Sequence, residues 1–267
     1  MASSMETFQI PLEAAEVYES KFVPRIFGKW APHIVDAAEI RAGQTVLDVA
    51  CGTGVVAREA ADRMEGQGKV VGLDLNENML VVARRLRPDI EWRQGDAAEL
   101  PFPDGSFDAV LCQAALMFVP DPVRALGEMA RVVSTDGTVA VQVFGRAEAQ
   151  PAYVRFVDVA ARHVGPEATT LLGTYWSLGD LDKLAVLFEE AGLEITDTRT
   201  RVETATWDSI DELIKTEIDG SPLSGRISAE VYQKILEDSR EALRSFQSGT
   251  GQAEIPLVGH LITARKR

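Results

Sequence analysis

The sequence predicts an α/β protein built on a doubly wound, mostly parallel sheet. Short apolar runs rich in β-branched residues alternate with amphipathic helical segments between residues 44 and 144. Such alternation indicates βαβ units with right-handed crossovers around a buried sheet. The chain has 267 residues, of which 46% are apolar and 25% charged. This size and composition suit a soluble globular protein with a substantial core.

The first half of the chain shows the alternation most clearly. The expected strands are apolar runs bounded by turn residues, and they cover 44–50, 69–74, 90–94, 107–112 and 138–144. The helices between them are expected at 55–64, 76–87 and 121–133. Asn76 and Asp121 are suitable N-caps, Pro122 suits the first position of a helix, and Pro88 ends one.

Beyond residue 144 the pattern changes to mainly helical segments. Helices are expected at 14–27, near the N-terminus, and at 153–163, 180–191, 208–218 and 228–247. Strand-like runs at 193–204 and 255–264 suggest an antiparallel hairpin that completes one sheet edge. We therefore expect a single domain over 1–267, with N-terminal lid helices at 1–40, a helical cap at 145–192 and a second helical insert at 205–250.

The composition excludes several classes of partner. The chain has 27 Lys and Arg against 41 Asp and Glu, a net charge of −14, so nucleic acid and anionic membranes would be repelled. No apolar run approaches the ~18 residues of a membrane span, and the N-terminus lacks a secretory signal. Cys51 and Cys112 lie in apolar runs, which is typical of free thiols in a reducing cytoplasm. We expect a cytoplasmic protein with a small-molecule partner.

The most informative segment is the turn after the first strand, Ala50-Cys-Gly52-Thr-Gly54. Two glycines separated by one residue allow a tight turn and a close approach of ligand at a helix N-terminus. Asp74 ends the second strand, where a carboxylate can accept both hydroxyls of a ribose. Taken alone, this pattern also fits the dinucleotide fingerprint of NAD-type oxidoreductases. A glycine turn that binds nothing is the third interpretation.

Two further carboxylates favour a cationic ligand over a pyrophosphate. Asp48 lies inside the first strand, where a dinucleotide needs no acid, and Asp96 follows the third strand. Asp96 can accept the amino group of an adenine. Asp48 has an alternative structural role, in which backbone N–H groups satisfy its carboxylate.

These segments resemble a known family. Val46-Leu-Asp-Val-Ala-Cys-Gly-Thr-Gly54 resembles motif I of the class I S-adenosylmethionine-dependent methyltransferases, and Val71-Gly-Leu-Asp74 resembles the next motif. Gly95-Asp-Ala-Ala-Glu-Leu-Pro-Phe-Pro-Asp-Gly-Ser-Phe-Asp108 resembles a segment of the small-molecule branch that includes quinone-biosynthesis C-methyltransferases. The resemblance is strongest over about 18–145 and extends loosely to the end of the chain. It implies a seven-stranded sheet of order 3-2-1-4-5-7-6, with an antiparallel last strand, helices on both faces and a helical cap.

The resemblance also implies the cofactor, S-adenosyl-L-methionine, and its contacts. The glycine turn would meet the methionine part, the acid after the second strand the ribose, and Leu75 and Met79 the adenine, unless they are ordinary core residues. Asp96 and Ala97 would meet the adenine amino edge, Gln113 the methionine end, and Phe118 the transfer site. The full set is Asp48, Ala50, Gly52, Gly54, Asp74, Leu75, Met79, Asp96, Ala97, Gln113 and Phe118.

Aromatic residues of the N-terminal helix and the cap are candidates for an acceptor pocket. Core packing is the alternative for each of them. The resemblance implies that the N-terminal helix folds over the cofactor and excludes water from the nucleophile. The candidates are Tyr18, Phe22, Phe27, Tyr153, Phe156, Tyr175 and Trp176.

Catalytic groups and metal ligands are sparse in this sequence. Many relatives carry a histidine after the fourth strand, whereas this chain has Gln113-Ala-Ala-Leu-Met-Phe118. His33 and His260 suit structural roles, so His163 is the one weak candidate for a base. No spacing of Cys, His and acidic residues predicts a metal site.

We therefore expect a metal-independent methyltransferase that acts on a small, partly apolar metabolite and produces S-adenosyl-L-homocysteine. The alternatives are an NAD-type oxidoreductase and a cofactor-binding protein without transfer activity. The acceptor, the methylated atom and the oligomeric state are left open.

Overall fold

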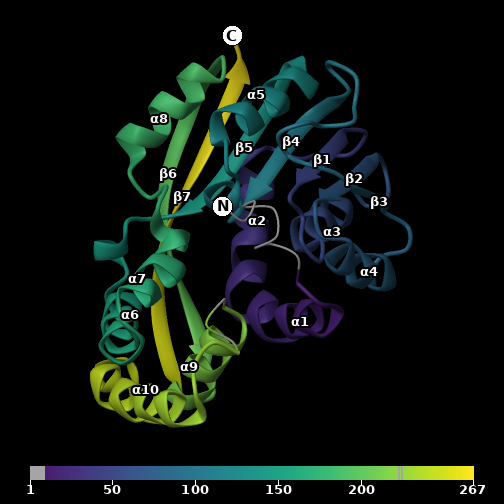
Figure 1. The fold of residues 1–267 in the computed structure, drawn as a ribbon. Helices are drawn as coiled ribbons and strands as arrows, with labels where there is room; N and C mark the ends of the chain where they lie inside the picture. Colours follow the sequence, from purple (N-terminus) through teal and green to yellow (C-terminus); the bar gives the residue numbers. More distant parts are fainter. Residues whose placement is uncertain (1–9, 222, 224) are drawn as a thin grey trace.

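The computed structural model describes residues 10–221, 223 and 225–267, and its central feature is a seven-stranded sheet (Figure 1). The strand order is β3-β2-β1-β4-β5-β7-β6, as the sequence predicts. The first five strands pair in parallel, and β7 runs antiparallel to both of its neighbours. The strands are β1 Thr45–Val49, β2 Lys69–Asp74, β3 Glu91–Gln94, β4 Phe107–Gln113, β5 Val133–Phe144, β6 Leu193–Trp207 and β7 Ala253–Lys266.

Helices cover both faces of the sheet and also form a separate group beside it. Helices α2, α3 and α4 contribute to one buried apolar cluster, and α5 and α8 to the other. The helices are α1 Leu12–Val17, α2 Gly28–Ala37, α3 Val55–Arg63, α4 Glu77–Leu86, α5 Pro122–Val132, α6 Pro151–Val164, α7 Pro166–Gly173, α8 Leu181–Glu190, α9 Ile210–Asp219 and α10 Ala229–Ala242. None of the described helices is long and apolar enough to cross a membrane.

The alternation of side chains along the strands explains why the sheet is buried on both faces. In β1, Val46 packs in the cluster of α2 and α3, whereas Leu47 packs in the cluster of α5. In β4, Ala109 and Val110 divide in the same way. Each face is therefore apolar, which is the pattern of a parallel sheet between two helical layers.

The last two strands extend beyond the rest of the sheet. Residues 259–264 of β7 pair with β5, whereas residues 253–258 pair with β6 alone. Helices α6, α7, α9 and α10 gather around this extension, at the lower left of Figure 1. Helices α6 and α7 of the first insert and α9 and α10 of the second thus form one lobe beside the carboxyl end of β5, whereas α8 of the first insert packs on the sheet.

The N-terminal segment differs from the single helix expected at 14–27. Helix α1 continues into a π-helical stretch, Tyr18–Phe27, and then into α2. Pro24 lies inside the π-helical stretch, and a proline removes one backbone donor from a helix. Wide π turns accommodate such an interruption without ending the helix. Residues 1–9 of the expected lid lie outside the described residues.

Some element boundaries also differ from the expected ones. Strand β5 begins at Val133, and its pairing with β4 shifts register before Thr138. The strand therefore includes the Asp136-Gly137 turn as an irregularity. β6 and β7 are longer than expected, because they continue to pair with each other beyond the residues of β7 that pair with β5.

Candidate functional site

The glycine turn between β1 and α3 has a backbone that favours glycine. Gly52 and Gly54 have φ of 56° and 86°, and Ala50 has a φ of 55°. The Gly52 N–H donates to Asp74 Oδ2 at 2.7 Å, while Asp74 Oδ1 accepts from the Asn76 N–H at 2.8 Å. The Asp74 carboxylate therefore ties the turn to the end of β2. The Leu75 N–H is a third backbone donor to this carboxylate. A carboxylate offers about four acceptor positions, so one is left for a ligand.

Asp48 has the structural role that the sequence offers as one alternative. Its side chain is 1% exposed and its Oδ2 accepts from the Ala57 N–H at 2.9 Å. Burial raises the pKa of Asp48 to about 8, a hydrogen bond from Ala57 opposes this, and the charge of Asp74 adds to it. Burial also raises the pKa of Asp74 above its ordinary value. A cationic ligand would favour the ionised form of both carboxylates.

Gly54 is required by packing as well as by its conformation. A Cβ placed there would lie 2.2 Å from the Trp92 ring, and a Cβ at Gly72 would lie 2.3 Å from the same ring. Trp92 is buried, and its indole N–H donates to the Arg87 carbonyl at 2.9 Å. Because Gly54 has no Cβ, the Trp92 ring can pack directly beneath the turn.

The carboxyl end of β4 presents a buried amide beside the turn. Gln113 Nε2 donates to the Phe27 carbonyl at 2.9 Å, whereas its Oε1 is buried and accepts no hydrogen bond within the described part of the chain. The next residue, Ala114, has a φ of 51°. A buried, unpartnered amide oxygen is costly unless something supplies a donor.

The remaining candidate cofactor residues lie at the ends of β2, β3 and β4. Leu75 and Met79 are partly exposed and belong to neither apolar cluster, so core packing does not explain them. Asp96 Oδ1 accepts from the Ala98 N–H at 2.8 Å, and Ala97 is buried in a core cluster. Phe118 meets Tyr175 edge-on, with ring centroids 4.9 Å apart.

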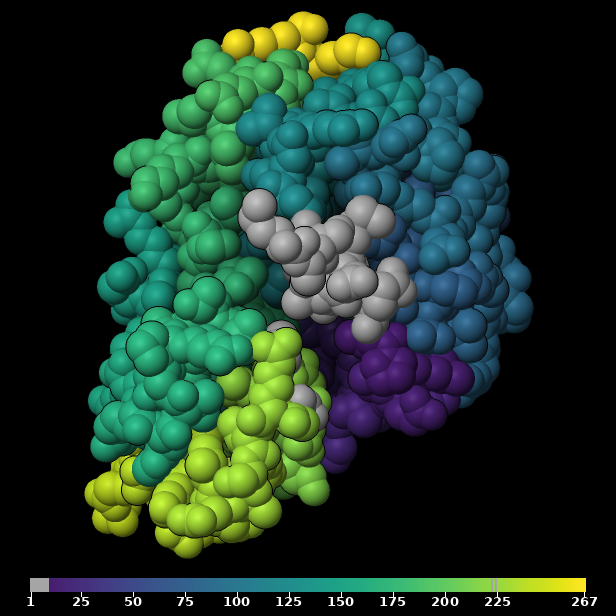
Figure 2. All heavy atoms as spheres, viewed as in Figure 1, coloured from purple at the N-terminus to yellow at the C-terminus, as the bar shows by residue number. Residues whose placement is uncertain are grey.

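The N-terminal segment lies across the glycine turn. A Cβ at Gly52 would lie 3.7 Å from the Tyr18 ring, and burial and the charges of Tyr175, Asp74, Glu19 and Asp48 raise the pKa of Tyr18. On one side, Glu19 pairs with Arg58 of α3 at 2.9 Å. On the other, Arg25 pairs with Glu212 of α9 at 3.0 Å. Figure 2 shows this segment in purple between the lime-green α9 region and the blue half of the sheet.

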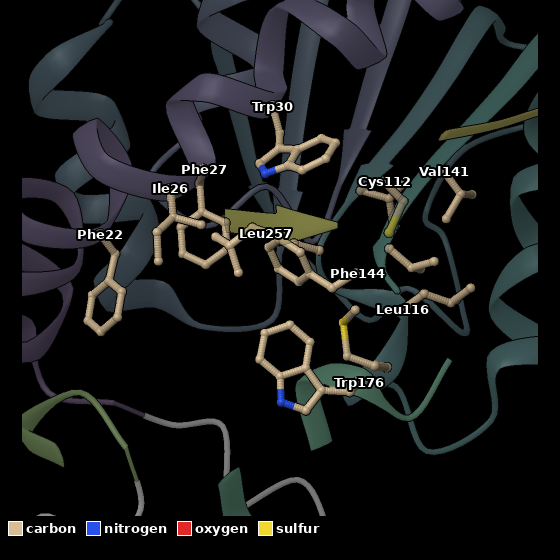
Figure 3. Close-up of a cluster of buried hydrophobic side chains, with 14 of the residues drawn as sticks. Phe22, Ile26, Phe27, Trp30, Cys112, Leu116, Val141, Phe144, Trp176 and Leu257 are labelled. Carbon is tan, nitrogen blue, oxygen red and sulfur yellow. The ribbon is translucent and has the colours of Figure 1, made fainter. Parts of the chain in front are cut away.

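A pocket of about 520 Å³, here called the acceptor pocket, lies between the N-terminal segment, the cap and α9. This volume includes the space at the open mouth of the pocket. Its lining is mostly aromatic and aliphatic; Figure 3 shows several of these side chains facing one another. The lining residues are Phe22, Ile26, Phe27, Phe144, Tyr153, Phe156, Leu172, Tyr175, Trp176, Glu217, Gly220, Ser221 and Leu257.

The structure brings together most of the predicted pocket residues. Tyr18 is not part of the lining, but it stacks on Phe27 with ring centroids 5.1 Å apart. The predicted aromatic residues of the cap all line the pocket. The cap and the N-terminal segment, far apart in sequence, therefore meet at one apolar cavity.

The three histidines lie outside the acceptor pocket. His163 pairs with Asp238 of α10 at 2.8 Å, so the geometry does not bring this candidate base to the pocket. His33 pairs with Glu203 at 2.6 Å, and His260 contacts the Thr200 hydroxyl at 2.9 Å. These contacts agree with structural roles.

The pocket contains one carboxylate that the sequence reasoning missed. Glu217 of α9 is 9% exposed, and its Oε1 accepts from the Tyr153 hydroxyl at 2.8 Å. Burial raises the pKa of Glu217 to about 7, while the Tyr153 hydrogen bond opposes this rise. A signal was present: Glu217 follows Ile210, Leu213 and Ile214 at helical spacing, and so lies on the apolar stripe of α9. Among the described residues, no cluster of three or more His, Cys, Asp or Glu could hold a metal.

Comparison with known proteins relates this chain to methyltransferases. Residues 47–141 match the model of a methyltransferase domain family. The chain is 36% identical over 180 residues to the demethylmenaquinone methyltransferase of Bacillus licheniformis, covering 62% of this chain and 77% of that protein. It is 33% identical over 185 residues to the ubiquinone/menaquinone biosynthesis C-methyltransferase UbiE of Escherichia coli, covering 63% and 73%.

The fold is also that of a solved structure. A crystal structure from Bacillus halodurans, described as a methyltransferase, superposes with a TM-score of 0.61. The two chains are 23% identical, and the match covers 88% of this chain and 98% of that one.

Proposed function

Because the chain belongs to the class I S-adenosylmethionine-dependent methyltransferases, in the branch that resembles the quinone-biosynthesis enzymes, we propose that its acceptor is a small aromatic ring compound held in the acceptor pocket. The reaction transfers a methyl group to a small metabolite and yields S-adenosylhomocysteine. The acceptor pocket is the observation that carries the proposal about the ring. Flat aromatic walls of phenylalanine, tyrosine and tryptophan suit a ring by stacked and edge-on contacts.

The relatives' names point in the same direction. The Bacillus licheniformis protein is named for demethylmenaquinone and the Escherichia coli protein for ubiquinone and menaquinone biosynthesis. Quinones and their reduced forms are flat rings that carry oxygen. We therefore place a quinone-like or hydroquinone-like ring among the candidate acceptors.

The cofactor site is proposed at the carboxyl ends of β1, β2 and β4. Gln113 Oε1 and the Asp48 carboxylate would hold the ammonium end, Asp74 the ribose hydroxyls, and Leu75 and Met79 the adenine faces. When bound, S-adenosylmethionine supplies an electrophilic methyl group on a positively charged sulfur. Tyr18 and Phe27 lie between the glycine turn and the acceptor pocket, where they exclude water from the reacting groups. Positioning and desolvation are thus the main contributions of these residues.

The sequence left two other functions open, and neither is favoured. An NAD-type oxidoreductase is not favoured, because the sequence relatives are methyltransferases. A cofactor-binding protein without transfer would have no use for a built acceptor pocket. The cytoplasmic location is part of the proposal and is supported by the free, buried Cys51 and Cys112.

Binding and transfer experiments test the proposal together. Calorimetric titration should detect S-adenosylhomocysteine binding and no NAD binding. Leu172→Trp, which fills the acceptor pocket, should leave S-adenosylhomocysteine affinity unchanged and reduce transfer of a labelled methyl group to a metabolite extract. Val186→Trp is the matched control, since Val186 is 50% exposed on α8. NAD binding in place of S-adenosylhomocysteine, or equal transfer by both variants and the wild type, would contradict the proposal.

A further inference from the structure

We propose that Glu217 is the base of the acceptor pocket and that its Oε2 takes the hydroxyl proton of a phenol-type or hydroquinone-type acceptor. Tyr153 is the positioning residue that holds the carboxylate. The inference rests on the proposed function and adds two things to it: the chemical group that the acceptor carries and the residue that receives its proton.

The geometry of the pair leaves one carboxylate oxygen available to the pocket. Tyr153 on α6 and Glu217 on α9 both line the acceptor pocket. The Tyr153 hydroxyl donates a hydrogen bond to Glu217 Oε1 at 2.8 Å. No other described residue donates a hydrogen bond to Glu217 Oε2. The single contact fixes the carboxylate without satisfying it. A hydroxyl donor in the pocket would complete its hydrogen bonding.

Within the described part of the chain, no cation neutralises Glu217. Tyr153 is the titratable group that acts on Glu217, while burial and the charge of Glu217 raise the pKa of Tyr175. No Lys, Arg or His is among the described residues that line the pocket. Lys21 and Arg25 pair instead with Glu212, on the same helix as Glu217. An unpaired carboxylate in an apolar cavity is unfavourable for folding, and an apolar residue at this position on the stripe would pack without that penalty. Its presence is explained by a task that needs a carboxylate there.

The pKa agrees with that task. Burial raises the pKa of Glu217 to about 7, so the group exchanges a proton near neutral pH. A general base is most effective when its pKa is near the working pH.

Methyl transfer to a hydroxyl-bearing ring releases a proton, which Glu217 is placed to receive. The hydroxyl-bearing ring forms a bond to the methyl carbon, through its oxygen or through a ring carbon that the oxygen activates, as the carbon–sulfur bond breaks and leaves its electron pair on sulfur. One proton is released for each methyl group transferred. In O-methylation this is the hydroxyl proton, which passes to Glu217 Oε2. In C-methylation Glu217 takes the hydroxyl proton as the bond forms, and the ring later loses the proton of the substituted carbon to solvent while Glu217 returns its own. Among the described residues that line the acceptor pocket, Glu217 is the only carboxylate.

A binding experiment tests the proposal without turnover. The probes are 1-naphthol and 1-methoxynaphthalene, which share a ring but differ in the hydroxyl donor, and both are titrated into protein loaded with S-adenosylhomocysteine. For the wild type, we expect the preference for 1-naphthol to rise about tenfold or more between about pH 5.5 and about pH 8.5, as Glu217 ionises and becomes a charged acceptor. In Glu217→Gln the preference should be small and independent of pH. Glu237→Gln removes an exposed carboxylate of neighbouring α10 and should behave as the wild type.

Tyr153→Phe gives a readout that a purely structural pair would not give. The Tyr153 hydrogen bond lowers the pKa of Glu217, so its loss should move the rise in 1-naphthol preference to higher pH. Asp48 also carries a proton in this pH range, so the two proteins are compared by infrared difference. The wild-type spectrum minus the Glu217→Gln spectrum should contain a protonated-carboxyl band that disappears over the same pH range. A rise that is unmoved in Tyr153→Phe would overturn the role of Tyr153.

The failure of this inference is distinguishable from that of the proposed function. A flat 1-naphthol preference in wild-type protein that binds S-adenosylhomocysteine would overturn the role of Glu217 alone. Tighter binding of 2-phenylethylamine than of 1-naphthol, lost in Glu217→Gln, would replace the hydroxyl acceptor by an amine and so overturn the proposed class. Wild-type protein that does not bind S-adenosylhomocysteine would instead contradict the proposed function.

Discussion

Replacing Gly54 by alanine separates the packing role of this glycine from its backbone role. Gly54 has a φ of 86°, and its added Cβ would lie 2.2 Å from the Trp92 ring. A left-handed conformation destabilises an alanine by about 1–2 kcal/mol, and overpacking adds about 1–3 kcal/mol. We expect Gly54→Ala to lower the free energy of unfolding by about 2–5 kcal/mol, the sum of these two contributions, measured by urea denaturation without ligand.

Gly43 provides the matched control. Its φ of 89° is almost the same, but an added Cβ would meet no atom within 4 Å. Gly43→Ala should therefore lower the free energy of unfolding by the backbone contribution alone, about 1–2 kcal/mol. The difference between the two variants measures the contact with Trp92.

A double-mutant cycle with Trp92→Leu checks that attribution. The smaller side chain leaves room for the methyl group that Gly54→Ala adds, so this substitution should be about 1–3 kcal/mol less harmful in the Trp92→Leu background. Equal losses for Gly54→Ala and Gly43→Ala, or a coupling near zero, would show that the tryptophan does not require the glycine. Gly54 would then be explained by its conformation and by ligand approach alone.

The cofactor site and the lid give four further predictions. Asp74→Asn should weaken S-adenosylhomocysteine binding by about 2–3 kcal/mol, because charged hydrogen bonds to the ribose are lost, and unchanged affinity by calorimetry would refute this. Asp48 has a folded pKa of about 8 and an ordinary value of 3.8, so the folded protein binds the extra proton and wild-type stability should fall as pH rises between these values. Asp48→Asn should lack this fall, and denaturation at a series of pH values should show a gain relative to the wild type of at most about 6 kcal/mol; parallel pH profiles would contradict the raised pKa. Exhaustive chelation should leave methyl transfer unchanged, since the described residues offer no metal cluster, and activity restored only by magnesium would contradict this. Amide hydrogen exchange in residues 12–28 and 145–179 should slow when cofactor and acceptor bind, and identical exchange in both states would remove the lid hypothesis.

Local patterns were sufficient to predict the strands, the helices between them and the glycine turn, whereas the strand order came from the resemblance to the methyltransferase family. Asn76 and Asp121 cap the expected helices by accepting N–H donors from Asn78 and Arg124. The carboxyl ends of parallel strands meet at one edge, so the acids within or just beyond the last residues of β1, β2 and β3 could be grouped from their strand assignments.

Features that depend on contacts between distant segments could not be predicted in this way. The extension of β6 and β7 depends on their mutual pairing and on the helices around it, which no local periodicity encodes. His163 was a reasonable candidate by its position in the cap, but its partner Asp238 lies 75 residues later in the chain. Glu217 was missed for the same reason, because its surroundings come from α6, the cap and the N-terminal segment.

Transfer of a labelled methyl group under single-turnover conditions tests the proposed reaction itself. The protein is loaded with an equimolar amount of S-adenosylmethionine labelled in its methyl group and mixed with an extract of small metabolites. We predict that the label moves to a small acceptor that partitions into organic solvent, with one S-adenosylhomocysteine formed for each label transferred. If the labelled S-adenosylmethionine stays bound and intact through repeated additions of extract, the chain binds the cofactor without transferring its methyl group, and the proposed function is wrong.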